Sequence, residues 1–246
     1  GTVTVMTMGP PNACAILRDS LYRGADRAIL LTDRRAAASD TLATSYILSA
    51  AIRKLPRFDL VLCGRQAIDG DTAQVGPQLA EKLAIPQVTY LEELVKLDGR
   101  KITIRRNVGA GWELVEGTLP ILVTVMATAN TPRPAGAKRI MKYKNARAAV
   151  EIAAQVANGR DPNDPAVKGE IDRQVERLRA KGLLIEQWSL DDTSADLAWC
   201  GRSGSPTKVH RIQAVVLKAS GHKRIEPNLD GIRGMIHELI EERTLG

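Results

Sequence analysis

The sequence predicts an α/β protein with a parallel, doubly wound nucleotide-binding sheet, an attached antiparallel meander and an extended C-terminal arm. Two observations support this prediction. Residues 2–84 alternate β-branched or apolar runs with amphipathic stretches, a pattern typical of β–α–β units and a parallel sheet. Residues 87–127 change to a period of two, interrupted by glycines, which is typical of antiparallel hairpins.

The first part of the chain contains three expected strands, at 2–8, 27–32 and 58–63, and three expected helices, at 11–24, 39–55 and 76–84. In the helix over 11–24, the predicted apolar face holds Ala13, Ile16, Leu17 and Leu21, and Gly24 is placed to end it. Ser39 or Asp40 is expected to cap the second helix, and Pro77 suits the first turn of the third. These elements predict a parallel sheet that is covered on both faces.

The C-terminal part is predicted as a second domain, residues 128–246, after an α/β nucleotide-binding domain over residues 1–127. Proline and glycine indicate an extended arm over 128–139. A helix over 164–182, a strand over 209–219 and a terminal helix over 229–244 follow, and the last is expected to pack on a partner subunit. The apolar line of the 164–182 helix consists of Val167, Ile171, Val175 and Leu178. Because residue 1 is Gly rather than Met and the chain opens directly inside a strand, we expect that it does not begin at the native start.

Composition excludes several functional classes. Aromatic residues make up only 3% of the chain, which argues against the stacking surfaces that bind single-stranded nucleic acid. No apolar run approaches the roughly 20 residues of a membrane helix, so no direct membrane insertion is predicted. Cys14, Cys63 and Cys200 are far apart in the sequence, so we predict neither a disulfide framework nor a metal site. A cytoplasmic location is expected, and any membrane association would be peripheral, through partner subunits.

The stretch "GRQAIDGDTAQVGP" (64–77) is the candidate ligand site. It follows a strand and enters a helix, and in open α/β sheets ligands bind beyond the carboxyl ends of the strands. The loop has no lysine at the spacing of a phosphate-transfer motif, which favours holding a nucleotide over transferring a phosphoryl group. A structural turn stabilised by aspartate is the alternative. No pairing of nucleophile and base is evident, so we predict no catalytic side chain, and a cofactor would carry any chemistry.

Several collinear stretches resemble the electron transfer flavoprotein beta subunit family. They include "VTVMTMGPPNACAILRDSLYRGADRAIL", "SDTLATSYILSAAI", "FDLVLCGRQAIDGDTAQVGPQLAEKLAIPQVTY", "TLPILVTV", "RIMKYK" and "GSPTKV". The resemblance implies that a strand and a helix precede this chain in the native protein. It implies a heterodimer with an alpha subunit that carries FAD. It also implies that the beta subunit binds either AMP, as in simple members, or a second FAD that accepts hydride from NADH, as in electron-bifurcating members.

Two features resemble the bifurcating branch of this family. Simple members typically carry an acid and an asparagine where this chain has Gly70 and Ala73. About 50 residues between "KYKNAR" and "GRSGSPT" exceed the usual connection, and this enlargement resembles nitrogen-fixation-type members. The resemblance therefore implies electron transfer to ferredoxin or flavodoxin, and through the alpha-subunit FAD to a quinone reductase or dehydrogenase. The implied partners are the alpha subunit, a quinone oxidoreductase and a ferredoxin-like protein.

The resemblance assigns cofactor binding to residues at the ends of several strands. The assigned residues are Met8, Gly9, Thr41, Thr44, Gly64, Arg65, Gln66, Ala67, Ile68, Asp69, Gly70, Asp71, Thr72, Ala73, Gln74, Val75, Gly76 and Pro77. Arg65 is a candidate to stabilise reduced, anionic flavin; a phosphate clamp and a structural ion pair are its alternatives. Two other functions stay open: a simple electron carrier with structural AMP, and a nucleotide-binding regulatory module.

Overall fold

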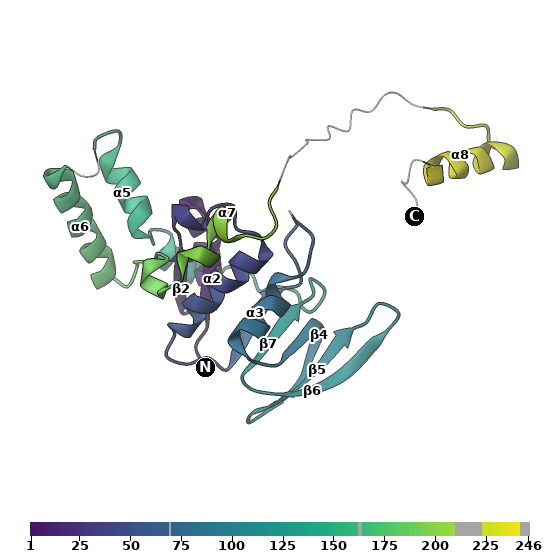
Figure 1. Ribbon diagram of the computed structural model, residues 1–246, viewed down its shortest axis with the longest axis horizontal. Helices are drawn as coiled ribbons and strands as arrows, with labels where there is room; N and C mark the ends of the chain where they lie inside the picture. Colours follow the sequence, from purple (N-terminus) through teal and green to yellow (C-terminus); the bar gives the residue numbers. More distant parts are fainter. Residues whose placement is uncertain (69, 162–163, 210–222, 242–246) are drawn as a thin grey trace. The chain divides into compact units, whose positions relative to one another are not determined.

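The computed structural model describes the chain except residues 69, 162–163, 210–222 and 242–246. It forms two compact units, Gly1–Lys208 and Val209–Gly246. Strands and helices alternate over residues 4–98 of the first unit (Figure 1), and the predicted α/β class is confirmed. The predicted division at 127/128 stays a prediction.

The parallel strands lie in two sheets. The first sheet has the order β1-β2-β8, with β1 at Thr4–Met8, β2 at Arg27–Leu31 and β8 at Glu186–Trp188, all parallel. The second has the order β3-β7-β4-β5-β6, with β3 at Leu60–Gly64, β4 at Gln87–Asp98, β5 at Lys101–Asn107, β6 at Trp112–Thr118 and β7 at Ile121–Val125. The sequence did not predict this division or strand β8.

The predicted meander is antiparallel only over β4, β5 and β6. Strand β7 was expected to continue it, and this detail was wrong: β7 runs parallel to both β3 and β4. Its sequence "ILVTV" is buried at four of its five positions. A nearly continuous apolar run is the signature of a parallel strand in the interior of a sheet, and it outweighs the local alternation.

The helices of the first half form close to where the sequence predicts them. Helix α1 covers Cys14–Arg23 after a 3₁₀ turn, η1 (Pro11–Ala13), and ends at Gly24, whose φ is 124°. Asp40 caps α2 (Thr41–Arg53) by accepting a hydrogen bond from the Ala43 amide. Helix α3 covers Val75–Leu83. These caps and stops follow from local side-chain chemistry, and so the sequence could predict them.

One predicted face of α1 was wrong. Cys14, Leu17 and Leu21 are buried, whereas Ile16 is 61% exposed. A helix turns about 100° per residue, so Ile16 lies roughly 200° from Cys14, on the opposite side. The small, apolar Cys14 thiol takes the core position that the sequence analysis gave to Ile16.

The core lies on both sides of β2. Ala28 and Leu30 pack with α1 and with Ile185, whereas Ile29 and Leu31 pack with Ile47 of α2 and with Trp188. The parallel sheet is therefore covered on both faces there, as predicted. Strand β3 departs from this expectation, because Leu60 and Leu62 on one of its faces are exposed.

The remaining elements belong to the C-terminal half. The helices are α4 (Ala137–Tyr143), α5 (Ala149–Ala157), α6 (Pro165–Ala180), α7 (Gly201–Gly204) and α8 (Leu229–Glu241), and the 3₁₀ turns are η3 (Asp191–Thr193) and η4 (Leu197–Trp199), with η2 (Arg34–Ala36) earlier in the chain. The arm predicted over 128–139 therefore ends where α4 begins. Helices α6 and α8 match predicted helices, α5 was not predicted, and the strand expected at 209–219 lies almost wholly outside the described residues.

Candidate functional site

The loop over 64–77 begins at the carboxyl end of β3. Gly64 pairs in register with Val125 of β7, and the Arg65 amide donates a hydrogen bond of 3.0 Å to the Val125 carbonyl. The two parallel strands thus end together. This is the edge of an α/β sheet at which ligands bind.

A cavity of about 850 Å³ lies at this edge. Its lining comes from the end of β3, the loop and the segment after β7: Leu62, Cys63, Gly64, Arg65, Gln66, Ile68, Asp71, Val125, Met126, Ala127 and Thr128. The volume is within the range of small-molecule and cofactor sites. Sequence reasoning missed Val125–Thr128, although the parallel pairing of β7 with β3 brings these residues to the site.

The three glycines of the loop serve different purposes. A Cβ atom at Gly64 or Gly70 would find no atom within 4 Å, whereas one at Gly76 would lie 2.5 Å from Cγ2 of Thr124. Gly64 and Gly70 therefore leave open space beside the loop. Gly76 is required for the close packing of α3 on β7, so it has a structural role in this chain.

The loop is folded by its own polar groups. The Gln66 side-chain amide donates to the Asp71 carboxylate, and the Asp71 amide donates to the Ala67 carbonyl at 3.1 Å. Asp71 and Ala73 have φ angles of 52° and 54°. Left-handed backbone at non-glycine residues is uncommon and is concentrated at ligand-binding loops.

The N-terminus of α2 joins this loop. The Thr41 hydroxyl donates a hydrogen bond of 2.8 Å to Oε1 of Gln74, which directly precedes α3. The first amides of a helix lack intrahelical acceptors and favour anions. The Thr41–Gln74 bond therefore joins two helix starts that could face a phosphate.

Other predicted residues are placed differently. Met8 packs against the core cluster of Ile29, Leu31 and Trp188, and the Gly9 amide donates to the Leu31 carbonyl at 3.0 Å. The Thr44 amide donates to the Asp40 carbonyl within α2. Among the described residues, no contact links Met8, Gly9 or Thr44 to the cavity, and Asp69 lies outside the described residues. Other predicted residues belong to the loop or to the starts of α2 and α3 but do not line the cavity: Thr41, Ala67, Gly70, Thr72, Ala73, Gln74, Val75, Gly76 and Pro77.

Arg65 is exposed, and its guanidinium forms no ion pair with any carboxylate among the described residues. A guanidinium that lines a cavity and pairs with no carboxylate among the described residues is suited to an anionic ligand.

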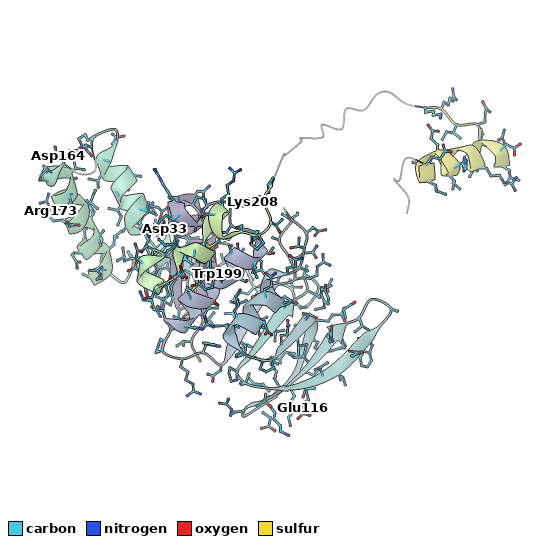
Figure 2. The ribbon with its side chains drawn as sticks, viewed as in Figure 1. Asp33, Glu116, Asp164, Arg173, Trp199 and Lys208 are labelled. Carbon is cyan, nitrogen blue, oxygen red and sulfur yellow. The ribbon has the colours of Figure 1, made fainter. Side chains whose placement is uncertain are left out.

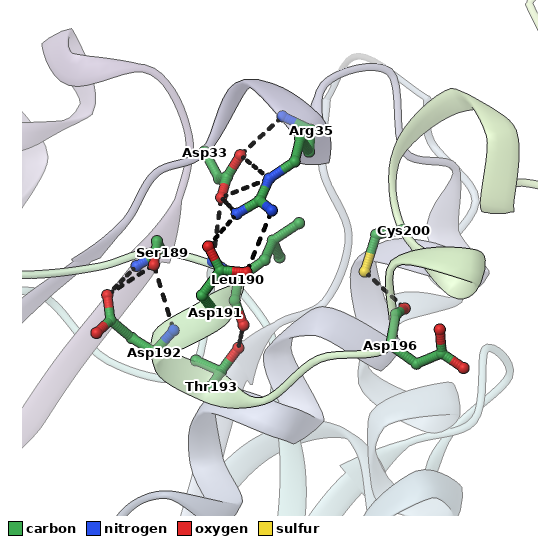
Figure 3. A network of polar contacts seen from close by, with 9 residues as sticks. All are labelled: Asp33, Arg35, Ser189, Leu190, Asp191, Asp192, Thr193, Asp196 and Cys200. Atoms are coloured by element: carbon green, nitrogen blue, oxygen red, sulfur yellow. Dashed lines mark hydrogen bonds and ion pairs between the residues drawn. The ribbon is translucent and has the colours of Figure 1, made fainter.

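Residues 189–207, which we name the clamp, lie at the carboxyl end of β2 and against the start of α2. Arg35 bonds Asp33 at 2.6 Å and Asp191 at 2.7 Å, and the Leu190 amide donates to Asp33 at 3.2 Å (Figure 3). Hydrogen bonds from Arg35 lower the pKa of Asp33 to about 2. The carboxylate is therefore ionised and saturated with donors at neutral pH.

Residues of the clamp also form hydrogen bonds with Asp40. The Asp40 amide donates to the Ser205 hydroxyl, and the Thr207 amide donates to the Asp40 carboxylate, both at 2.9 Å. Burial alone would raise the pKa of Asp40, but hydrogen bonds from the Ala43 and Thr207 amides outweigh it and lower the pKa. The stretch "GSPTKV" did not predict a role for Ser205 or Thr207. Their hydrogen bonds to Asp40 are evident only in the folded structure.

None of the cysteines has the character of a nucleophile. Burial, and then the nearby Glu151 carboxylate, raise the pKa of Cys14 to about 12. Burial likewise raises the pKa of Cys63 and of Cys200. No group of three or more His, Cys, Asp or Glu that could hold a metal ion occurs in the part of the chain that the structure describes.

The sequence matches the electron transfer flavoprotein domain family over residues 1–155. It is 38% identical over 243 residues to the electron transfer flavoprotein subunit beta of Clostridium acetobutylicum, covering 99% of this chain and 79% of the relative. The chain belongs to the electron transfer flavoprotein beta subunit family.

Other relatives point to one branch of the electron transfer flavoprotein beta subunits. The caffeyl-CoA reductase-Etf complex subunit CarD of Acetobacterium woodii is 34% identical over 243 residues, covering 99% of this chain and 78% of the relative. Protein FixA of Sinorhizobium fredii is 36% identical over 247 residues, covering 98% and 74%. The similarity supports the predicted FixA-like type. No helix among the described residues is long and apolar enough to cross a membrane.

The cavity fits the flavin or nucleotide that the family implies. It has open space beside Gly64 and the guanidinium of Arg65, which pairs with no carboxylate among the described residues. The two helix starts joined by the Thr41–Gln74 bond adjoin the loop but do not line the cavity. These features suit an anionic ligand with an extended apolar part, because the cavity is also lined by Leu62, Ile68 and Val125.

Proposed function

We propose that this chain binds FAD at the carboxyl ends of β3 and β7 and acts as the beta subunit of an electron-bifurcating flavoprotein. The supporting observation is the cavity of about 850 Å³ lined by the loop over 64–77. When bound, FAD would accept hydride from NADH and pass electrons singly, one toward ferredoxin or flavodoxin and one through the alpha-subunit FAD toward a quinone reductase or dehydrogenase.

The residues of the chain would bind and tune this cofactor. Arg65 would place a positive charge beside the ligand, favouring an anionic reduced state. The starts of α2 and α3, with Thr41 and Gln74, would offer donors to phosphate. Leu62 and Ile68 would cover apolar surface and exclude water. The predicted roles of Met8, Gly9 and Thr44 remain proposals that require the bound cofactor to contact them.

Open space at Gly70 favours FAD over AMP. A Cβ there would meet no atom within 4 Å, so no packed side chain fills the exposed region beside Gly70, which lies in the loop between the cavity-lining residues Ile68 and Asp71. The similarity to CarD and FixA supports the same choice. We further propose an alpha subunit as the heterodimer partner, together with a quinone oxidoreductase and a ferredoxin-like protein, in a cytoplasmic complex that reaches a membrane only through other subunits.

The test is to purify the chain with its alpha partner and to quantify bound flavin and nucleotide by absorption and chromatography. Two flavins per heterodimer, together with reduction by NADH, would support the proposal. One flavin plus AMP would select the simple electron carrier instead. No flavin with bound ATP would indicate the nucleotide-binding regulatory module.

A further inference from the structure

A second cavity, of about 800 Å³, lies between α5 and α6. The two helices lie side by side, as Figure 1 shows. Arg18 of α1 bonds both oxygens of Glu151 at 2.8–2.9 Å, and Arg147 forms a parallel bridge with Leu184. The α5 wall of this groove is thus fixed to the core.

The groove is strongly basic. Four cationic side chains, Arg147, Arg160, Arg177 and Lys181, line it with a single carboxylate, Glu170. Glu170 lies 3.6 Å from Arg160. No carboxylate among the described residues pairs with Arg177 or Lys181, so the groove keeps uncompensated positive charge.

Basic residues of α6 also lie outside the groove. On another side of α6, Arg179 pairs with Glu176. Arg173 projects into solvent from α6 and does not line the groove (Figure 2). The difference offers a matched pair of residues, Arg173 and Arg177, one turn apart on the same helix.

The groove also has an apolar floor and amide groups. Ile152 is 4% exposed, and Val156, Leu178 and Leu183 are half-buried. The amide side chains on the lining are those of Asn145, Gln155, Asn158 and Gln174. Side-chain amides both donate and accept, so they can bond the N–H and C=O groups of a peptide backbone.

Among the described residues that line the groove, none is aromatic and none is glycine. Stacking on an aromatic ring and close approach to glycine backbone are the usual means of holding a base and its phosphates. Carboxylates of a ligand would pair with the arginines of the groove, and aliphatic side chains of the ligand would pack on its apolar floor. We propose that this groove docks an acidic, amphipathic polypeptide segment of a partner protein.

This proposal concerns a surface apart from the flavin cavity and does not depend on the proposed function. Point variants are preferable to deleting residues 148–200, because β8 pairs with β2 and Trp188 and Leu190 are part of the core. The test measures, by fluorescence anisotropy, binding of the full chain to a labelled helical peptide with glutamate on one face and leucine on the other. A peptide with lysine in place of glutamate is the matched probe.

We expect the acidic peptide to bind and the basic peptide not to bind. Arg177→Glu should weaken binding about tenfold or more, since it opposes like charges, whereas Arg173→Glu should change it less than about twofold. Circular dichroism should show both variants folded, and flavin content should match the parent. Binding should weaken as salt shortens the screening length.

Three outcomes would overturn the proposal. The first is equal loss in both variants, which would indicate a diffuse charge effect, and the second is no binding of the acidic peptide. The third is tight binding of inorganic phosphate, an oligonucleotide or anionic vesicles that is lost in Arg177→Glu but kept in Arg173→Glu, with the peptide failing to compete. That pattern would assign the groove to a different class of anion. None of these outcomes bears on flavin content.

Discussion

The clamp and the loop over 64–77 both lie at the carboxyl ends of parallel strands, but their polar groups are used in opposite ways. At the clamp, Asp191 and Asp33 both pair with Arg35, and the Asp40 carboxylate accepts hydrogen bonds from two amides. In the loop, Arg65 has no described carboxylate partner, and Gly64 and Gly70 border open space. A region whose charges are already paired maintains the fold, whereas an exposed cation with no carboxylate partner among the described residues is available to a ligand.

The sharpest contrast between the two regions is at their glycines. Gly201 of the clamp has a φ of 61°, and a Cβ there would lie 2.1 Å from the Arg35 carbonyl oxygen. We expect Gly201→Ala to lower the free energy of unfolding by about 3 kcal/mol, since it combines backbone strain with overlap. Gly70→Ala should change it by less than about 0.5 kcal/mol.

Urea denaturation followed by circular dichroism measures both values. Equal destabilisation by the two substitutions would show that the loop is as tightly packed as the clamp. It would thereby remove the distinction between the two regions.

Asp40 joins the clamp to the start of α2. Asp40→Ala removes the helix cap and the acceptor of the Thr207 amide, so we expect a loss of about 1–2 kcal/mol in the free energy of unfolding. Asp40→Asn keeps a capping oxygen and should lose less than half as much. If the two variants lose stability equally, the charge of Asp40 matters more than its hydrogen bonds.

The ion pair of Asp33 gives a pH dependence. Its folded pKa of about 2 lies below the ordinary aspartate value of 3.8. Its contribution to stability is therefore complete above pH 3.8 and is lost as the pH falls toward 2. Solvent screens the partly exposed Arg35, so Asp33→Asn should cost only about 1 kcal/mol at neutral pH.

The stability difference between the parent and Asp33→Asn should shrink steadily between those pH values. Denaturation midpoints measured across this range check the sign. A difference that stays constant down to pH 2 would mean that the carboxylate of Asp33 does not contribute through its charge.

Local signals made much of the fold predictable. Gly24, Asp40 and the apolar runs of β1, β2 and β3 fix elements through their own chemistry, and the sequence placed these within a few residues. Strand β8 has only three residues, which is too short for a hydrophobic periodicity, so the sequence did not predict it. The parallel course of β7 depends on burial by distant elements, which local alternation does not reveal.

The candidate site divides in the same way. Its loop was recognised because Gly64, Gly70 and Pro77 form a readable pattern. The residues after β7 and the Thr207–Asp40 bond were not predicted, because they reach the site only through pairing between distant segments. A tertiary contact between distant segments cannot be predicted from a single sequence when no local pattern accompanies it.

Arg65 should show the smallest effect on stability and the clearest effect on ligand. Since its guanidinium has no described ion-pair partner, Arg65→Ala should change the free energy of unfolding by less than about 0.5 kcal/mol. Loss of a cation beside an anionic ligand should weaken flavin retention about tenfold or lower the flavin reduction potential. Arg57→Ala is the control, because Arg57 is 75% exposed and pairs with Asp59 away from the cavity.

Flavin content after gel filtration and a redox titration measure these effects in the complex with the alpha subunit. Unchanged content and potential in Arg65→Ala would exclude Arg65 from the binding site. A large loss of stability in this variant would instead place Arg65 with the clamp residues, whose charges are already paired. Loss of flavin from Arg65→Ala with an unchanged free energy of unfolding is the one result that supports an Arg65 charge used to bind a ligand.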